Sequence, residues 1–499
     1  MNKKYLSFAI LFAILLSSCD STPTNIGVDE KTLSDTYLLN KLNGDREVLY
    51  LDSIGKQNIL VIPVAFDDPE YLNLVNDNTL TCIENAFFGD SSDTSFYSLS
   101  DYYYQSSYQK LNIQGKVSDW FHVGITSSEL KSKEEDSYAG EGGTIWLLNK
   151  AVDWYKENYN DIEDFDNNGD RVIDAVWLVY NVPNVKENLQ MDETFWAFTF
   201  WDTNNANSTS YEPCAYSWAS VYSLFGEYSD GSLLKPDTRT IIHETGHLLG
   251  LIDYYDTTGS SVPAGMVDMM DMNIGDHNAY SKFSLGWIKP RYVYGDGVYT
   301  LEPFEENGDA IIVSYNNYNE TPYDEYFIIE YITPTGLNEK DYKIVYPGNN
   351  LLGYERPGIR ISHVDSRGFN LFEQNDGFYV TSTDDYEEMD ILLTENNSKP
   401  TYDFLTSSSN IPFRRLTIMQ KNATSIKNVL DDNFLDRPFS QSYLNNFLYF
   451  EGDSFSLSDD NYRDLMPNHS SVLNNGIIFN LDISIVSLND NEAKIAISL

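Results

Sequence analysis

Apolar and polar positions follow two different patterns along this chain, and the change comes near residue 290. In the first part, residues 58–66 (NILVIPVAF) and 173–181 (IDAVWLVYN) are apolar enough for buried strands, and 111–123 predicts a strand pair. Apolar residues at three- and four-residue spacings predict helices at 77–89, 98–111, 143–159 and 237–250. Strands that alternate with helices are typical of an α/β domain.

Residues that favour helix ends stand at the expected boundaries. Asp77, Ser98 and Asp237 begin three of the helices, where a side-chain oxygen can accept a hydrogen bond from a free backbone N–H group. Gly89 and Gly250 stand where the first and the last of these helices are expected to end.

Beyond Pro290 the chain consists of strand-like runs between Asn, Asp and Gly turns, with little helical periodicity. These runs lie at 298–304, 309–316, 325–332, 358–365, 476–488 and 493–499. We therefore expect an α/β (α+β) domain over residues 47–290 and a mainly β region over residues 291–499, for which a β-sandwich is a candidate architecture.

The composition limits the classes of partner. The 499 residues carry a net charge of -44 with a pI near 4.2, so phosphate backbones and anionic membrane surfaces would be repelled. We expect no nucleic-acid partner. Acidic groups in such number are mostly solubilising surface, and some are suited to bind calcium through oxygen.

The first residues predict export. A basic start and an apolar run from Tyr5 to Leu16 are typical of a signal peptide, and the run is shorter than the roughly 20 residues that a spanning helix needs. LSSC resembles the lipobox of bacterial lipoproteins, in which the cysteine is acylated. We expect a signal over residues 1–19, lipid on Cys19 and a polar tether over 20–46; an ordinary secretory signal is the alternative.

Two further cysteines, Cys82 and Cys214, remain. In an oxidising exterior they could form a disulfide, and buried thiols are the equal alternative.

The sequence HETGH contains two of the six histidines. His243 and His247 are four residues apart, so on a helix they share a face and can bind one metal ion, with Asp253 as a potential oxygen ligand. Zinc lowers the pKa of a bound water toward about 7, and Glu244 can take the proton as the water attacks a carbonyl. The alternative is a helix whose histidines satisfy polar groups of the core. The turn expected at Gly250 favours the zinc site over this alternative. The reaction expected of such a site is hydrolysis, most often of a peptide bond.

HETGHLLGLIDYYD fits HExxHxxGxxD, and together with MVDMMDMNIGDHNAYSKFSLGW it resembles the immune inhibitor A family of secreted bacterial zinc metallopeptidases, relatives of the metzincins. LSDYYYQSSYQKLNIQGKV, YFIIEY and GIRISHVD are similar too, so the resemblance covers about residues 47–370. It implies a zincin-like catalytic domain that includes the β region to about residue 370, and an extracellular endopeptidase that acts on proteins or peptides. It makes His243 and His247 zinc ligands and Glu244 the general base.

The third zinc ligand has three candidates. Asp253 takes the place of the third histidine in the metzincin pattern and would complete the zinc shell. Glu330 in YFIIEY or His277 could supply the third ligand instead, with Asp253 hydrogen-bonded to a ligand.

Other residues near the motif have supporting roles in this interpretation. The resemblance places Met270 in a packing floor under the metal, with Met269 or Met272 as alternatives. His363 in SHVD is expected to be structural. A tyrosine hydroxyl could stabilise an oxyanion, although packing is the commoner role among 37 tyrosines. The candidates are Tyr254, Tyr255 and Tyr280.

The acidic loop before the second apolar run resembles an EF-hand calcium loop at its start, with Gly169 at the sharp turn. Its end differs, because Ala175 stands where a glutamate is expected. A structural calcium would offset the repulsion among the oxygens, and a plain acidic turn is the alternative. The candidate ligands are Asp164, Asp166, Asn168, Asp170 and Asp174.

These features predict a monomeric, lipid-anchored, calcium-stabilised zinc endopeptidase outside the cell, with the membrane contacted only by its lipid. The alternative is a surface adhesion or binding module in which the β-rich half binds a partner and the zinc is structural. A site closed by four protein ligands would favour that alternative, whereas three ligands and an open position favour catalysis.

Overall fold

The structure is a computed structural model of mixed α/β architecture. None of the helices it describes is long and apolar enough to cross a membrane. The described residues are 30–32, 51–133, 142–183, 195–201, 210–213, 215–225, 235–255, 262–316, 318–346, 351–366, 370–374, 377–381, 415–421, 441–459, 471–473 and 476–499.

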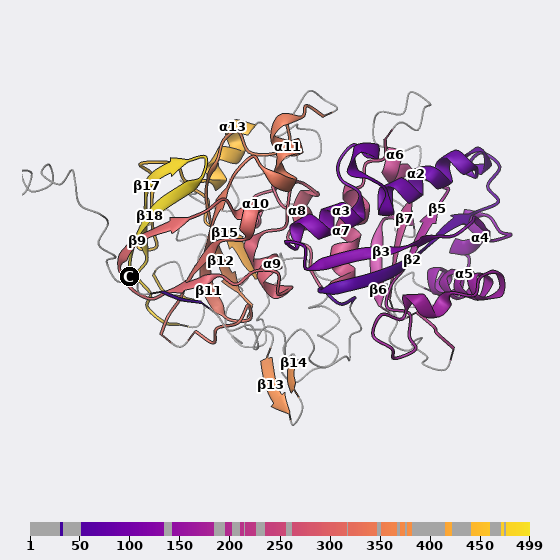
Figure 1. The fold of residues 1–499 in the computed structure, drawn as a ribbon, viewed down its shortest axis with the longest axis horizontal. Coiled ribbons are helices and arrows are strands. Elements are labelled where there is room, and N and C mark those ends of the chain that lie inside the picture. Colours follow the sequence, from indigo (N-terminus) through magenta and orange to yellow (C-terminus); the bar gives the residue numbers. More distant parts are fainter. Residues whose placement is uncertain are drawn as a thin grey trace, which may run out of the picture.

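The first part of the chain builds a six-stranded sheet (Figure 1). Its order is β3-β2-β5-β7-β6, with the short β4 also paired to β2. β2 is parallel to β3, β4 and β5, and β5 is parallel to β7, whereas the edge strand β6 is antiparallel to β7. The strands are β2 (Gly55–Ala65), β3 (Leu111–Val117), β4 (Phe121–His122), β5 (Val176–Tyr180), β6 (Phe198–Trp201) and β7 (Ala215–Ser220). The buried strands expected here are confirmed, and the two strands expected at 111–123 are present as β3 and β4, which each pair with β2 rather than with each other.

Helices cover both faces of this sheet, because successive side chains of each strand point to opposite faces. Leu60 and Ile62 of β2 belong to a core that includes residues of α5. Ile59 and Val61 point the other way and, with Trp177, share a core with α2, α3 and α7. α3, α7 and α8 therefore lie between the sheet and the rest of the molecule (Figure 1).

The four predicted helices of this part are present as α2, α3, α5 and α7, with differences at some ends, whereas the periodicity did not indicate the short helices α4, α6, α8 and α9. The α-helices are α2 (Asp77–Phe88), α3 (Leu99–Ser106), α4 (Ser127–Lys131), α5 (Gly142–Asn158), α6 (Tyr222–Phe225), α7 (Arg239–Leu248), α8 (Met269–Met272) and α9 (Ala279–Ser284). The 3-10 turns are η1 (Leu72–Leu74), η2 (Ser91–Asp93) and η4 (Ile162–Phe165).

Two predicted caps were wrong by one residue. Asn76, not Asp77, caps α2, because its side chain accepts a hydrogen bond from the N–H of Thr79. Thr238 occupies the cap position of α7 without a side-chain bond, and Asp237 accepts from the N–H of Arg239.

The other helix ends that the sequence predicted are confirmed, except the C-terminal end of α3. Ser98 caps α3, and Gly89 follows α2. α3 ends at Ser106 rather than near residue 111, since Tyr108 and Gln109 adopt φ of 53° and 67°.

The second part is mainly β, as expected, with two sheets and a hairpin. One sheet has the order β1-β8-β10-β11-β12-β15 and the other β16-β17-β18-β9. Their strands are β1 (Glu30–Thr32), β8 (Arg291–Val293), β9 (Gly297–Leu301), β10 (Ala310–Val313), β11 (Glu325–Ile332), β12 (Gly358–Asp365), β15 (Leu416–Ile418), β16 (Ser454–Ser456), β17 (Asp482–Asn489) and β18 (Glu492–Ser498); the hairpin is β13 (Asn370–Gln374) with β14 (Gly377–Thr381). β1 falls in the segment expected to be a tether, and it pairs with β8.

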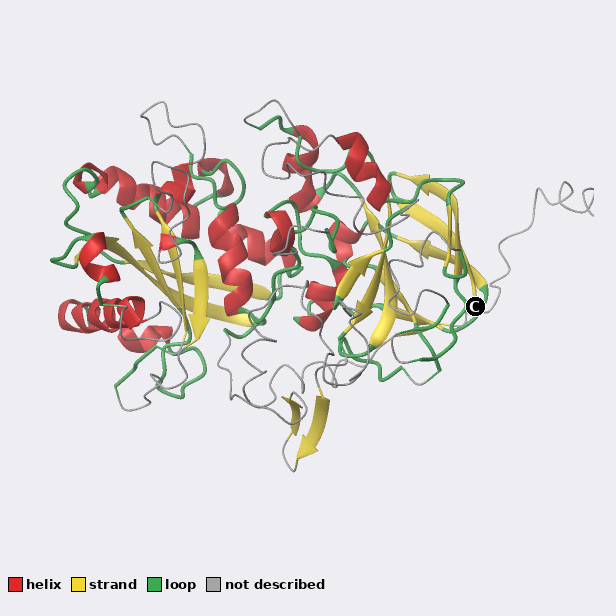
Figure 2. Cartoon of the chain, turned by 180° about the vertical axis from the view of Figure 1, so that it is seen from behind, coloured by secondary structure: helices red, strands yellow, loops and turns green. Residues whose placement is uncertain are grey.

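Short helices interrupt this β region, which the periodicity did not indicate. They are α10 (Phe304–Asn307), η7 (Gly336–Asn338), α11 (Glu339–Lys343), α13 (Gln441–Leu444) and η11 (Asn445–Phe447). One face of the β1-to-β15 sheet contributes Ile312 and Ile328 to the core that contains α7. Its other face shares a second core with the β16-to-β9 sheet. Figure 2 shows helices gathered between the first sheet and this β region.

Candidate metal centre

Helix α7 carries the two histidines and is anchored from two sides. The indole N–H of Trp177 on β5 donates to Thr245 Oγ1 at 3.1 Å, and the Tyr103 hydroxyl of α3 donates to the carbonyl of Ile242 at 2.6 Å. The four-residue spacing places His243 and His247 on one side of the helix, with ring centroids 5.0 Å apart.

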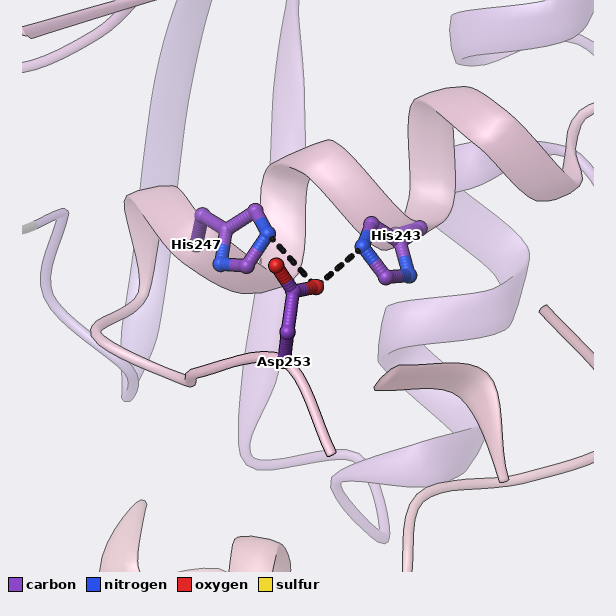
Figure 3. Close-up of side chains that lie close together, drawn as sticks. All are labelled: His243, His247 and Asp253. Atoms are coloured by element: carbon purple, nitrogen blue, oxygen red, sulfur yellow. Dashed lines mark hydrogen bonds and ion pairs between the residues drawn. The ribbon is translucent and has the colours of Figure 1, made fainter. Parts of the chain in front are cut away.

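The chain turns back directly after α7. Gly250 adopts φ of 92°, a conformation that glycine tolerates well, so it ends the helix as predicted. The N–H of Leu251 then donates a hydrogen bond to the carbonyl oxygen of Gly246 at 2.9 Å. This bond holds the segment that follows α7 against the helix. This turn brings Asp253 in front of the two imidazoles (Figure 3).

One oxygen of Asp253 lies between the histidines. Asp253 Oδ1 is 2.9 Å from His243 Nε2 and 3.3 Å from His247 Nε2, and all three side chains are buried. Their ligand atoms lie within 4.8 Å of one another. A tetrahedral zinc ion with bonds of about 2.0–2.1 Å holds its ligand atoms about 3.4 Å apart, so this group needs only small adjustments to bind such an ion.

Backbone carbonyls fix which ring nitrogens face the centre. His243 Nδ1 is 2.8 Å from the carbonyl oxygen of Met269, and His247 Nδ1 is 2.9 Å from that of Leu251. A carbonyl only accepts, so each Nδ1 carries a proton and donates it. In the neutral rings the lone pairs are then on both Nε2 atoms, which point to Asp253 and can bind a metal.

The group behaves as an ion pair in the absence of metal. Burial lowers the pKa of His247, but the charge of Asp253, the hydrogen bonds to Asp253 and Leu251 and the charge of Glu244 together outweigh it and raise that pKa from 6.5 to about 9. The pKa of His243 is raised in the same way, against its burial. Burial raises the pKa of Asp253, but the charge of His247 and the hydrogen bonds from both rings outweigh it and lower that pKa. Metal and protons therefore compete for these imidazoles.

Glu244 is buried beside the histidines. Burial raises the pKa of its carboxyl group, and the two neighbouring imidazoles oppose this rise. The Thr199 hydroxyl of β6 has one hydrogen, which it shares between Glu244 Oε2 at 3.1 Å and the Glu244 carbonyl oxygen at 2.9 Å. A fixed carboxylate of this kind can accept and return a proton.

The structure brings Asp253 to the histidines, and not the other two candidate ligands. Glu330 Oε1 accepts from Arg360 Nε at 2.7 Å, in a buried ion pair. His277 is buried among Tyr102, Tyr103 and Trp287, and within the described residues neither of its ring nitrogens has a hydrogen-bond partner.

The remaining motif residues differ in whether they contact the candidate site. A Cβ atom on Gly246 would lie 2.5 Å from Met270 Sδ, so Met270 packs directly under α7, as predicted for the packing floor. Met269 contributes its carbonyl, and Met272 is only partly buried. His363 pairs with Glu325 at 3.0 Å, a structural contact.

Of the three tyrosines proposed to stabilise an oxyanion, Tyr255 is the one that lies beside the histidines. Its ring stacks 6.4 Å from that of His243, and burial followed by the Asp253 charge raises the pKa of its hydroxyl. The Tyr254 hydroxyl instead forms a 2.7 Å hydrogen bond with Ser281 Oγ, and Tyr280 contacts Ser366 and Arg415.

The acidic loop is organised by its own hydrogen bonds. Asp166 accepts from the N–H groups of Gly169, Asp170 and Arg171. Asp174 accepts from the N–H of Asn167, and burial raises its pKa to about 7. The five candidate ligands all lie in this loop, but in the described part of the chain only His243, His247 and Asp253 form a group of three or more metal-binding side chains with converging ligand atoms.

Two sequence expectations, the lipid on Cys19 and the disulfide between Cys82 and Cys214, involve residues that the structure does not describe. Cys19 and Cys214 lie outside the described residues. Cys82 is a buried free thiol in α2, and burial raises its pKa to about 11. Its pairing with Cys214 stays a prediction.

Thr199 and Ser217 belong to the site and were missed. Nothing in the sequence FTFW marks a threonine as a partner of a glutamate 45 residues later. The one available signal was that FTFW is a short aromatic run, which lies in the sequence between the apolar run 173–181 and the motif.

Comparison with models of known protein families gives no match, and no curated protein matches the chain.

Zinc uptake by the metal-free protein should release a proton from His247. Because its pKa is raised from 6.5 to about 9, His247 is protonated at pH 7 and must lose that proton before Nε2 can bind a metal. We expect the apparent zinc affinity to rise at least tenfold per pH unit up to pH 9, more steeply where His243 is also still protonated, and then to level off. Calorimetric titrations at pH 7 in buffers of different ionisation enthalpy measure the released proton. The exposed His122→Gln serves as control, and an affinity independent of pH contradicts the prediction.

Met270 and Gly246 should be coupled energetically. Gly246→Ala forces Met270 Sδ to move, which we expect to cost about 1–3 kcal/mol of unfolding free energy. In Gly246→Ala/Met270→Ala the added methyl group has room, so the loss should be smaller than the sum of the two single losses. Urea unfolding of the four proteins measures this, and additive losses would rule out the contact.

Proposed function

We propose that this chain is an extracellular zinc endopeptidase of the immune inhibitor A type. The observation that carries the proposal is a buried group of two imidazoles and a carboxylate with converging ligand atoms, next to a buried glutamate on the same helix. We also propose that the first part has a zincin-like fold and that the two facing sheets of the second part form a β-sandwich.

His243, His247 and Asp253 would hold the zinc ion through Nε2, Nε2 and a carboxylate oxygen. When bound, zinc polarises a carbonyl group and lowers the pKa of a coordinated water. Two nitrogens and one oxygen suit zinc, and three protein ligands leave a position open.

Glu244 is the proposed general base and acid. Its Oε2 is tied to Thr199, which leaves the other carboxylate oxygen to accept a proton from the attacking water and to pass it to the leaving amine. The raised pKa of this buried carboxyl group suits both steps, because a group that ionises nearer neutrality takes up and returns a proton more readily.

An adhesion module with a structural zinc is the competing function. It would need a fourth protein ligand to close the site, and the described residues place three metal-binding side chains there. A structural zinc site would not need a buried glutamate such as Glu244. Burying an ionisable group costs folding free energy, so its presence favours a catalytic role.

We place the protein outside the cell, attached by lipid on Cys19, on the strength of the signal-like start and the LSSC sequence. Proteins or peptides are the proposed substrates, and the enzyme acts as a monomer.

Glu244→Gln should abolish peptidase activity while zinc stays bound. The amide keeps the shape of the side chain but cannot take up a proton, so we expect a loss of about 10²- to 10⁴-fold in kcat. Casein hydrolysis, with metal content measured on the same sample, tests this. Glu84→Gln, an exposed change on α2, should keep full activity. Full activity in Glu244→Gln, or activity that survives complete removal of metal, would refute the mechanism.

A calcium ion in the acidic loop is the second proposed cofactor. We expect calcium at a hundred times its dissociation constant to stabilise the zinc-loaded protein by about 2.7 kcal/mol, which appears as a rise in melting temperature. Asp166→Asn should abolish this rise, because it removes a charged oxygen from the loop. Asp153→Asn, an exposed change on α5, should not affect it. An unchanged melting temperature with calcium would leave the loop as a plain acidic turn.

A further inference from the structure

The edge strand β6 delivers a hydroxyl group to Glu244. β6 is the last strand of its sheet, and Thr199 lies directly opposite Ser217 of β7 in the antiparallel register. Both side chains lie on the face of the sheet that α7 covers, because Thr199 contacts Glu244 there. The general base and this strand are 45 residues apart in sequence and adjacent in space.

The hydrogen bonds of Thr199 have a defined direction. Thr199 Oγ1 lies 2.9 Å from the Glu244 carbonyl oxygen, 3.1 Å from Glu244 Oε2 and 2.8 Å from Ser217 Oγ. A carbonyl and a carboxylate only accept, so the single hydroxyl proton of Thr199 points to Glu244. Ser217 must then donate to Thr199. A chain of two hydroxyl groups therefore ends on the carboxylate.

We propose that Thr199 is a positioning residue for Glu244, oriented in turn by Ser217, and that both serve the peptidase reaction. This inference rests on the proposed function. Thr199 holds Oε2 in place, so that the other carboxylate oxygen faces the reacting atoms. In the described part of the chain, Thr199 is the residue that donates a hydrogen bond to this carboxylate.

The bond to the carbonyl of Glu244 makes the positioning specific. It ties the backbone and the side chain of one residue to the same donor, which restricts the rotamer of Glu244 relative to the axis of α7. His243 and His247 are fixed from the other side, by carbonyl oxygens of Met269 and Leu251. The base and the ligands are thus held by separate elements, and removing the hydroxyl group should displace only the base.

Thr199→Val tests the inference, because it replaces the hydroxyl group by a methyl group of similar size. We expect kcat to fall about 10- to 100-fold, the loss typical of a misplaced catalytic group, with KM within about twofold of the wild-type value. Zinc content and melting temperature should stay near those of the wild type. Thr199→Ser keeps the hydroxyl group and should restore most of kcat. A crystal structure of Thr199→Val should show the Glu244 carboxylate turned from its wild-type position.

Ser217→Ala provides a second variant that leaves every atom of Thr199 in place. The Thr199 hydroxyl loses its donor and can rotate, so kcat should fall by less than in Thr199→Val, again without loss of zinc.

The outcomes separate the inference from the proposed function. A wild-type protein that binds zinc and hydrolyses no peptide would end the proposed function and this inference with it. An active wild type whose Thr199→Val variant has unchanged kcat overturns the inference alone. So does a Thr199→Ser variant as slow as Thr199→Val, or a loss of zinc or melting temperature in parallel with kcat, because these results assign Thr199 a structural role.

Discussion

The candidate metal centre depends on one oxygen of Asp253 shared by the imidazoles of His243 and His247. Three ionisable side chains are buried at this point, and burying charge is costly unless the charges are paired. The pairing satisfies them without a metal, so the chain can fold before the ion arrives. It also sets the ligand atoms almost at the spacing that an ion requires. The same contact that stabilises the metal-free fold therefore prepares the site.

Much of this could be predicted from local sequence. The period of apolar residues located α7, and the spacing of His243 and His247 placed both on one face, because helix geometry fixes such neighbours. Gly250 predicted the reversal, since few other residues tolerate its φ of 92°. Asp253, three residues farther, was one of three candidates for the third ligand, and the structure places it at the histidines. Each of these inferences covers one short stretch of chain, within which the backbone leaves few alternatives.

What escaped prediction depends on contacts between distant segments. The carbonyl oxygen that orients His243 belongs to Met269. Every residue has a backbone carbonyl group, so the sequence does not indicate which one accepts this hydrogen bond. Thr199 reaches Glu244 because β6 pairs with β7 in one particular register, and a shift by one residue would turn it to the other face. The cap of α2 illustrates a smaller limit: Asn76 and Asp77 are both good caps, and only the observed hydrogen bond distinguishes them.

Glu330 shows how the β region takes part in the centre without binding metal. Its carboxylate holds Arg360, and the guanidinium of Arg360 donates to the carbonyl of Val267 at 2.9 Å. Val267 stands two residues before Met269, whose carbonyl oxygen orients His243. Glu330 of β11 and Arg360 of β12 thus support the imidazole of His243 indirectly, through the backbone segment that leads into α8. A β region that carried only a separate binding function would not need to be connected in this way. The candidate metal centre is accordingly a product of both parts of the fold, and cutting the chain near residue 290 would remove the support of one of its candidate ligands.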